Sequence, residues 1–344
     1  MIAYERSIRQ KKKVVTLGNG TGHGVLLEGL KRLPYSLTAI VNITDNGGHS
    51  GLLRQSMDTP SPGDLRKCIT SLADPGLTLT NLLKYRFSEG ELEGVCLGNL
   101  IIGALIRQEG ALSLASAKLG QMLGLEHEVI PASDESTHIC AQLPDGTVVV
   151  GEWEIIERGP EHKDIQRLFL QKTIRPVPRA LEAIGEADFL IIGPGSLRTG
   201  IISLLLVAGI KEAIRDSKAN KVYICNLMTQ PGQTDHFALR RHMEELYRYL
   251  PIEMDYTIAN DPGRIPPDIL RLVEDSYPVV IDHPIYPTKL VIKDLMKDID
   301  WQDIIHNGWK RKRSSFRSGP HLVVHDPDKL AAALAQIIDS PEIV

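Results

Sequence analysis

The fold is decided by two stretches near the start of the chain, VVTLGNGTGHGVLLEGL at residues 14–30 and LTAIVNITDNGGHSG at residues 37–51. Each opens with an apolar run and continues into a glycine-rich polar loop. Between the two loops, apolar residues recur at helical spacing, at Val25, Leu26, Leu27, Leu30 and Leu33. The pattern predicts a strand, a tight turn, a helix, a second strand and a second polar loop, which together form a βαβ unit.

The first glycine-rich loop is a candidate phosphate-binding site made of Gly18, Gly20, Thr21 and Gly22. Glycine has no Cβ, so its backbone N–H can approach a ligand closely. The N-terminus of the following helix also offers unpaired N–H groups to an anion. The spacing departs from the standard dinucleotide pattern, because His23 stands where the third glycine is expected. An ordinary tight connection without a ligand is the alternative interpretation.

The second loop begins with an acid, Asp45, which follows the first loop by about twenty residues, where a dinucleotide fold places the acid that reads the ribose. Asn46, Gly48 and Ser50 come next and could form a second concavity for an anion or a metal ion. A third segment, Pro62-Gly63-Asp64, predicts a turn in which Asp64 caps the next helix.

The composition is that of an ordinary globular protein. The chain has 344 residues, 42% hydrophobic and 24% charged, so it can bury a large core in one α/β domain or two smaller ones. Its net charge of −4 argues against nonspecific binding of nucleic acid. The four cysteines show no paired motif, which predicts buried thiols in a reducing compartment. The longest apolar run, residues 201–210, is half a membrane span, and no signal peptide opens the chain, so we expect a cytoplasmic protein.

The βα rhythm continues through most of the chain. Further strands are expected at residues 188–192, 221–225, 256–260 and 278–282, and helices at 65–73, 79–86, 98–106, 111–123, 199–214 and 238–250. From residue 128 the period changes to two, and strands are expected at 129–131, 137–143 and 147–155, with a Pro144-Asp145-Gly146 hairpin turn before the last. We expect this small antiparallel piece, about residues 128–178, to be an insertion.

Polar loops follow the carboxyl ends of several predicted strands. The candidate ligand contacts in the later loops are Gly195, Ser196, Asn226, Thr229 and Gln230. Ser196 is also a candidate helix cap, and Asn99, at a glycine-marked helix start, is either a cap or a ligand contact. In an open parallel sheet, ligands bind outside the carboxyl ends of the strands, near the point where the strand order reverses. The sequence therefore predicts a Rossmann-like, doubly wound, mostly parallel α/β sheet with one ligand crevice.

Six motifs occur in order along the chain: GTG at 20–22, DNGGHSG at 45–51, PGDLR at 62–66, GNL at 98–100, GPGSL at 193–197 and NLMTQPGQTD at 226–235. Together they resemble the bacterial gluconeogenesis factor (YvcK-like) family, a branch of the 2-phospho-L-lactate transferase (CofD-like) superfamily. The resemblance covers roughly residues 13–282 and the HDPDKLA segment at 325–331. It implies one CofD-like α/β domain at residues 13–344, preceded by a mobile N-terminal arm at residues 1–12.

For this branch the resemblance implies binding of UDP-sugars and a role in carbon metabolism and cell shape, with no settled catalytic activity. The transferase relatives move a phospholactyl-type group from a guanosine diphosphate donor to a deazaflavin, with magnesium. On that reading Asp45 and Asp64 would be the catalytic carboxylates, and Asp45 the metal ligand. We expect a nucleotide-sugar ligand, a protein partner and a homo-oligomer. No cofactor is expected to be required, and neither nucleic acid nor a membrane is an expected partner.

The chain departs from the family pattern at four positions, which are Asn19, Asn46, Val95 and Val324. Asn46 replaces the second of two adjacent aspartates, and it removes a negative charge where a hard cation prefers carboxylate oxygen. The departure weakens the transferase interpretation. A divergent basic segment lies at about residues 301–320. A solvated loop is its default interpretation, and a contact with nucleic acid, an anionic membrane or an acidic protein face is the alternative.

Three functions remain open at this point. A nucleotide-diphosphate-sugar sensor that acts through partners, without turnover, ranks first. A magnesium-dependent phospholactyl-type transferase ranks second. A NAD-binding oxidoreductase is suggested only by the first βαβ unit and Asp45, and it ranks last because no acid with an arginine partner stands out for hydride transfer.

Overall fold

The computed structural model describes residues 11–47, 51, 53–54, 59–158, 164–270, 273, 276–282, 288–299 and 323–340. The expectations for Gly48, Ser50, most of the N-terminal arm and the basic segment therefore lie outside the described residues. At the centre lies a seven-stranded sheet in the order β10-β9-β8-β7-β1-β2-β3. Its strands are β1 (Lys13–Gly18), β2 (Ser36–Val41), β3 (Glu128–Pro131), β7 (Phe189–Ile192), β8 (Asn220–Ile224), β9 (Tyr256–Asn260) and β10 (Lys289–Lys293).

Every neighbouring pair in this sheet is parallel. The chain builds β1, β2 and β3 toward one edge, then returns to the other side of β1 with β7 and continues through β8 and β9 to β10. The strand order therefore reverses between β1 and β7, which is the topological switch point of a doubly wound sheet. The predicted Rossmann-like α/β fold is confirmed.

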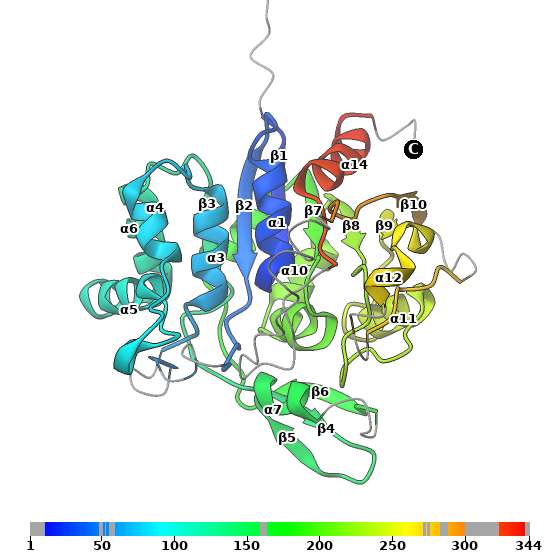
Figure 1. Cartoon of the computed structure of the whole chain (residues 1–344), viewed down its shortest axis with the longest axis horizontal. Coiled ribbons are helices and arrows are strands. Elements are labelled where there is room, and N and C mark those ends of the chain that lie inside the picture. The colour runs from blue at the N-terminus through cyan, green and yellow to red at the C-terminus, as the bar shows by residue number, and fades with distance from the viewer. Residues whose placement is uncertain are drawn as a thin grey trace, which may run out of the picture.

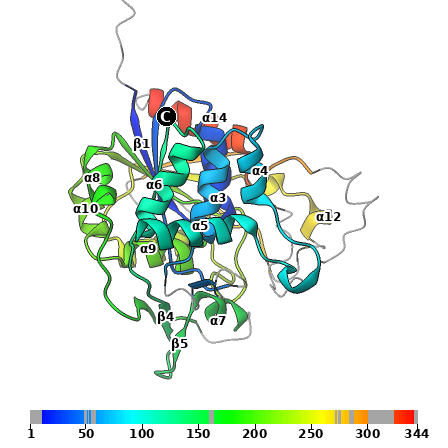
Figure 2. The same ribbon diagram turned by 90° about the vertical axis from the view of Figure 1, so that its left-hand side faces the viewer.

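Helices cover both faces of the sheet, which explains why its inner strands read as continuous apolar runs. The helices α1 (Gly20–Leu30), α3 (Gly63–Leu72) and α14 (Pro327–Asp339) lie together on one face, and α8 (Pro178–Glu186) and α10 (Ile210–Asp216) lie on the other (Figures 1 and 2). The remaining elements are α4 (Thr78–Lys84), η1 (Gly90–Leu92), α5 (Leu97–Glu109), α6 (Leu112–Met122), α7 (Glu152–Glu157), η2 (Leu197–Ile202), α9 (Ser203–Leu205), α11 (Leu239–Tyr249), η3 (Pro262–Arg264) and α12 (Pro267–Leu270).

A small three-stranded antiparallel sheet in the order β5-β4-β6 lies below the carboxyl ends of the parallel strands (Figure 1). It consists of β4 (Ile139–Gln142), β5 (Val148–Val150) and β6 (Arg167–Leu170). The strand predicted at 129–131 is β3, which belongs to the parallel sheet because it pairs with β2. The strand predicted at 147–155 was too long, since Gly151 leaves the β region with φ +111° and α7 follows. β6 was not predicted.

Two further expectations were wrong. The helix expected at 199–214 is broken into η2, which is a π-helix, the short α9, and α10, which begins after Gly209 adopts a left-handed conformation. The segment 278–282 forms only an isolated bridge between Pro278 and Met228. Proline lacks the N–H that a ladder requires, and the edge position is taken instead by β10.

The described residues contain no single helix long and apolar enough to cross a membrane, although α5 and α6 meet that test as a pair bent by 115°. The four cysteines are free and buried, as expected from their spacing.

Helix α14 packs on α1 and covers the start of the first βαβ unit. Asp326 caps it, because its carboxylate accepts the backbone N–H groups of Asp328 and Lys329. Gly29 lies at the crossing of the two helices, where a Cβ would overlap the backbone carbonyl of Pro327. The close packing of α14 therefore depends on the absence of a side chain at this position.

We predict that Gly29→Ala lowers the free energy of unfolding by about 1–3 kcal/mol, because it overpacks the crossing of α1 and α14. Gly185 is the matched control, since it is also the penultimate residue of a helix and a Cβ there meets nothing within 4 Å. Gly185→Ala should leave stability unchanged or raise it by about 0.4–1 kcal/mol. Urea unfolding measures both, and equal effects of the two substitutions would contradict this account of the crossing.

Candidate functional site

The glycine-rich loop after β1 meets the loop after β7 at the switch point of the sheet. Gly20 opens α1 with φ +66°, which a residue with a side chain adopts rarely. A Cβ on Gly22 would lie 3.2 Å from the carbonyl oxygen of Pro194. These glycines let the first turn of α1 lie directly beside the β7 loop, with its unpaired N–H groups at the carboxyl edge of the sheet.

Asn19 joins the same two loops from the other side. It precedes α1 but makes no capping hydrogen bond, and its side chain packs against the backbone of Gly195 and Gly200, where a Cβ would overlap it. Its Oδ1 is buried and has no hydrogen-bond partner among the described residues. Asn19, which stands where the family usually has glycine, thus places a polar side chain between the loop after β1 and the loop after β7.

His23, which stands in place of the expected third glycine, is part of the core. Its Nε2 lies 2.8 Å from the Thr16 hydroxyl and its Nδ1 lies 3.5 Å from the Cys68 thiol. Burial lowers the pKa of His23 to about 4, so the ring is neutral at pH 7. His23 therefore packs α1 against β1 and α3 and is not available to a ligand.

The loops after β7 and β8 bring a cluster of neutral polar groups to the crevice. The Ser196 hydroxyl lies 2.8 Å from that of Thr199 and donates to Gln233 Oε1 at 2.8 Å. The backbone N–H of Gly195 donates to Asn226 Oδ1 at 3.4 Å. Ser196 makes no capping bond, contrary to expectation, because its hydroxyl is used in this cluster. Short π-helical segments such as η2 often occur at functional sites.

Two other predicted contacts have mainly structural partners. Thr229 exchanges two hydrogen bonds with the backbone of Tyr277, at 2.7 and 2.9 Å, and so joins the β8 loop to the following segment. The backbone N–H of Gln230 donates to the Thr234 hydroxyl at 2.8 Å. The side-chain Oε1 of Gln230 is buried without a partner in the part of the chain that the structure describes.

The loop after β2 and the start of α3 contribute two carboxylates. Asp45 accepts the Gly47 N–H at 2.9 Å, and burial together with the charge of Asp64 raises the pKa of Asp45 to about 6. Asp64 Oδ1 accepts a hydrogen bond from the Lys67 ammonium at 2.9 Å, and the negative charge of Asp64 raises the pKa of Lys67. Asp64 lies within the first turn of α3 and does not cap it, so that expectation was wrong.

Asn99 is not a cap either. It lies inside α5 and its Oδ1 accepts Arg66 Nε at 2.9 Å, while Arg66 also donates to the Leu83 carbonyl at 3.1 Å. Gly98 leaves room for the Arg66 side chain, because a Cβ at position 98 would lie only 2.6 Å from Arg66 Cδ. A hydrogen bond thus joins the two motifs at 62–66 and 98–100. Through it Asn99 fixes the position of Arg66, which lies two residues after Asp64 of the site.

The sequence prediction missed Glu152, the first residue of α7. Its Oε1 accepts the Thr199 hydroxyl at 2.9 Å, and its side chain is only 9% exposed. Burial, and then the charges of Asp45 and Asp64, raise the pKa of Glu152 well above its ordinary value. The only local signal was Gly151, which could have ended the predicted strand one residue before this acid.

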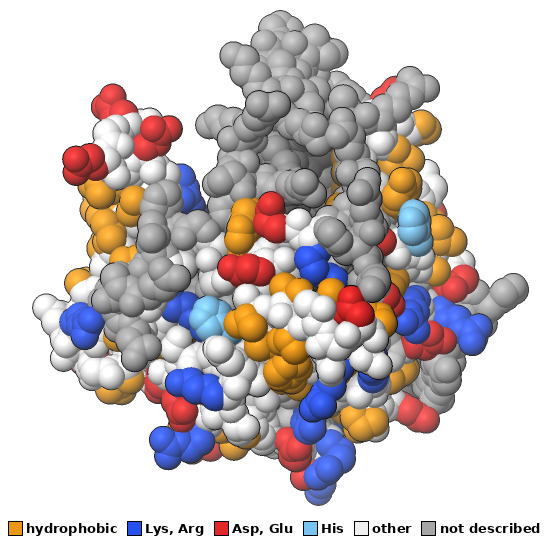
Figure 3. All heavy atoms as spheres, turned by 90° about the horizontal axis from the view of Figure 1, so that it is seen from below, with side chains coloured by type: hydrophobic (Ala, Val, Ile, Leu, Met, Phe, Trp, Pro, Cys, Tyr) orange, Lys and Arg blue, Asp and Glu red, His pale blue; other side chains and the backbone are white. Residues whose placement is uncertain are grey.

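Three carboxyl groups from three separate elements therefore meet near one ammonium group, that of Lys67. No group of three metal-ligating side chains in the described ranges is arranged to hold a metal ion. The Lys67 ammonium lies 2.9 Å from Asp64 Oδ1 and offsets part of the negative charge that would attract a magnesium ion, so this arrangement does not form a metal site. Figure 3 views this edge from below and shows acidic and basic side chains side by side, without one continuous charged region.

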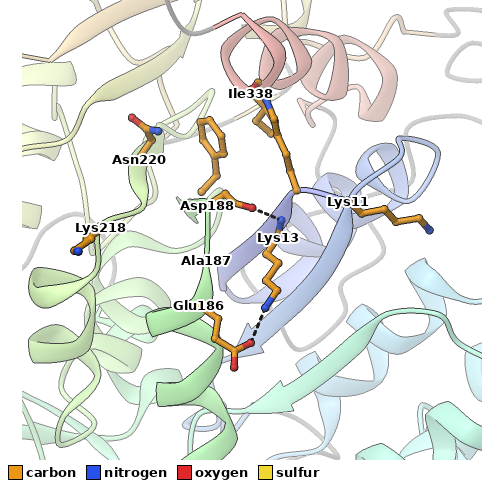
Figure 4. A pocket seen from close by; sticks show the side chains of 10 residues that line it. Lys11, Lys13, Glu186, Ala187, Asp188, Lys218, Asn220 and Ile338 are labelled. Carbon is orange, nitrogen blue, oxygen red and sulfur yellow. Dashed lines mark hydrogen bonds and ion pairs between the residues drawn. The ribbon is translucent and has the colours of Figure 1, made fainter. Parts of the chain in front are cut away.

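A hollow lies at the opposite edge of the sheet, where β1, β7 and β8 begin (Figure 4). Its polar groups are largely occupied by the fold. The Lys12 ammonium donates to the Ile338 carbonyl, and Lys13 donates from its backbone to Asp188 at 2.7 Å and from its side chain to Glu186 at 3.0 Å. We therefore place the functional site at the carboxyl edge, where Asn19 Oδ1, Glu152 Oε2 and Gln230 Oε1 are buried without hydrogen-bond partners among the described residues.

The acidic cluster should destabilise the protein near neutral pH. The pKa of Asp45 is higher in the folded protein than in the unfolded chain. Its contribution to the free energy of unfolding is therefore favourable below about pH 4 and is lost as the pH rises through about 6. We predict that Asp45→Asn is more stable than the wild type at pH 7 and that the difference disappears near pH 4. Urea unfolding as a function of pH measures this, with Glu91→Gln at an exposed position as control. A less stable Asp45→Asn protein at pH 7 would contradict the assignment.

Comparison with known proteins identifies the family of this chain. The family described as 2-phospho-L-lactate transferase CofD matches residues 14–297. Gluconeogenesis factors of Bacillus subtilis and Halalkalibacterium halodurans are each 39% identical, with 84% and 79% of this chain and 91% and 85% of theirs covered. A crystal structure of a Bacillus halodurans protein matches with a TM-score of 0.84 at 34% identity, covering 94% of this chain and 100% of that chain. The resemblance inferred from the six motifs is confirmed, and the chain belongs to the CofD family and, within it, to the gluconeogenesis factors.

Proposed function

We propose that this chain is a cytoplasmic regulatory protein that binds a nucleotide-diphosphate-sugar of the UDP-sugar type and acts on carbon metabolism and cell shape without turnover. The observation that carries the proposal is the meeting of two glycine-containing loops at the β1/β7 switch point. Such a crevice is where doubly wound sheets bind nucleotide ligands.

The diphosphate is assigned to the first turn of α1. The N–H groups of Gly20, Thr21 and Gly22 belong to the helix start, where intrahelical partners are lacking, and no acidic residue lies in this turn. Backbone N–H groups at a helix N-terminus favour a phosphate through hydrogen bonding and through the helix dipole. The contact of Gly22 with Pro194 keeps this turn at the edge of the crevice.

The nucleoside is assigned to the side of β8. Asn226 and Gln233 lie in the loop after β8, and both hold groups of the β7 loop, Gly195 N–H and the Ser196 hydroxyl. Amide side chains offer both donors and acceptors, so they can distinguish bases that phosphate contacts cannot. This assignment leaves the acidic side of the crevice, at β2, for the other end of the ligand.

A phospholactyl-type transferase is the second candidate, supported by the family description and by the carboxylates of Asp45 and Asp64. The ion pair of Lys67 with Asp64 and the amide at Asn46 favour the regulatory role, because both reduce the negative charge available to magnesium.

We predict that UDP-glucose binds the wild-type protein. Gly22→Val should weaken the binding of the UDP, GDP and ADP forms alike by about tenfold or more, because the added side chain separates α1 from Pro194. Asn226→Ala should instead change the order of preference among the three bases. Calorimetric titration measures both, and Gly185→Val in open space on α8 is the control.

Two outcomes would contradict the proposed function. One is the absence of binding of any nucleotide diphosphate to the wild type. The other is turnover of a guanosine-diphosphate-linked phospholactyl donor with magnesium at an ordinary enzymatic rate, on the order of 1–1000 per second.

A further inference from the structure

Glu152, the first residue of α7, is buried beside the loops at the carboxyl edge of the parallel sheet. One carboxyl oxygen, Oε1, is held by the Thr199 hydroxyl at 2.9 Å. The other, Oε2, is buried and has no hydrogen-bond partner among the described residues. A buried carboxyl oxygen without a partner is costly, and a ligand group that bonds to it would remove that cost.

Asn46 holds α7 in place with both ends of its amide. Its Oδ1 accepts the backbone N–H of Trp153 at 2.8 Å, and its Nδ2 donates to Glu154 Oε2 at 2.8 Å. Because Trp153 directly follows Glu152, this pair of bonds sets where Glu152 enters the crevice. An aspartate at position 46 could accept the N–H but would place two carboxylates against each other.

The charge distribution decides which part of a ligand this side can take. Glu152 lies near Asp45 and Asp64, and Lys67 is the cation paired with this cluster. A phosphate would be repelled by the carboxylates of Asp45 and Asp64, whereas a sugar hydroxyl can hydrogen-bond to Glu152 Oε2 both when this group is a carboxylate and when it is a carboxylic acid. In the proposed arrangement the nucleoside lies at β8, the diphosphate between β7 and β1, and the sugar toward β2. Glu152 lies between Thr199, which follows β7, and Asp45, which follows β2.

We propose that Glu152 contacts a hydroxyl of the sugar beyond the diphosphate, and that Asn46 positions it by clamping the start of α7. The inference rests on the proposed function and adds the residue that distinguishes a sugar nucleotide from the plain nucleotide. Glu152 is the contact residue, and Asn46 acts through it.

The first test compares UDP-glucose with UDP by calorimetry. Glu152→Ala should weaken binding of UDP-glucose by about tenfold, since the hydrogen bond to the sugar hydroxyl is lost, and should change UDP affinity by less than about threefold. Glu157→Ala is the control on the same helix and should change neither affinity; its Oε1 is also buried without a partner among the described residues, but it lies at the far end of α7 from Thr199. Equal losses for both ligands, or no loss, would overturn the role of Glu152 and leave the proposed function standing. Failure of the wild type to bind either ligand would overturn both.

The second test separates positioning from contact. Asn46→Asp should lower the UDP-glucose to UDP affinity ratio, because it repels Glu154 and displaces α7. The double variant Asn46→Asp with Glu154→Gln should restore the ratio, since a glutamine amide can donate to the new carboxylate while Trp153 N–H still bonds to it. A ratio that stays low in the double variant, or never falls in Asn46→Asp, would overturn the clamp.

Discussion

The ligand crevice depends on one close contact, that between the first turn of α1 and the loop after β7. Gly22 lies against Pro194, and the side chain of Asn19 fills the space beside Gly195. The contact occurs at the switch point, where helices of the two layers diverge and leave room at the carboxyl edge. The parallel sheet and its covering helices serve to hold these two loops at this distance.

The crevice has two chemically distinct sides. Backbone N–H groups and neutral amides and hydroxyls line the side of β1, β7 and β8, whereas Asp45 and Asp64 line the side of β2. Glu152 lies between the two sides, because it accepts the Thr199 hydroxyl and is close enough to Asp45 and Asp64 to feel their charges. Burial, and then the charges of neighbouring acids, raise the pKa of Asp45 and of Glu152, so ionising these carboxyl groups costs the fold free energy. Sites that are costly to the fold are typical of binding and catalytic regions, because stability alone would remove them.

Sequence patterns predicted the elements whose contacts are local. The first βαβ unit, the glycine loop and the later strand loops all follow from apolar periodicity and turn residues. Helix α7 was missed because a valine-rich run before it resembles one long strand, and Gly151 was the only local sign of its end. β3 was assigned to the wrong sheet, because the sequence of a four-residue apolar strand does not show its partner.

Side-chain roles were harder to predict than elements. Asp64 and Asn99 fit the pattern of helix caps, but Lys67 and Arg66 bind them instead. Lys67 lies three residues after Asp64 in α3, whereas the contact between Arg66 and Asn99 depends on how α3 meets α5. Glu152 was not a candidate, because Thr199 and Asp45 lie far from it in the sequence and reach it only when the antiparallel sheet folds beneath the crevice. Cap preferences describe one helix turn, whereas this site is assembled from several elements.

The most direct test of the account is a crystal structure of the protein grown with UDP-glucose. We expect the diphosphate against the N–H groups of Gly20–Gly22, the uracil toward Asn226, and the glucose within hydrogen-bond distance of Glu152. Density for the nucleotide at the opposite edge, among Lys12, Lys13 and Lys218, would contradict the central claim (Figure 4).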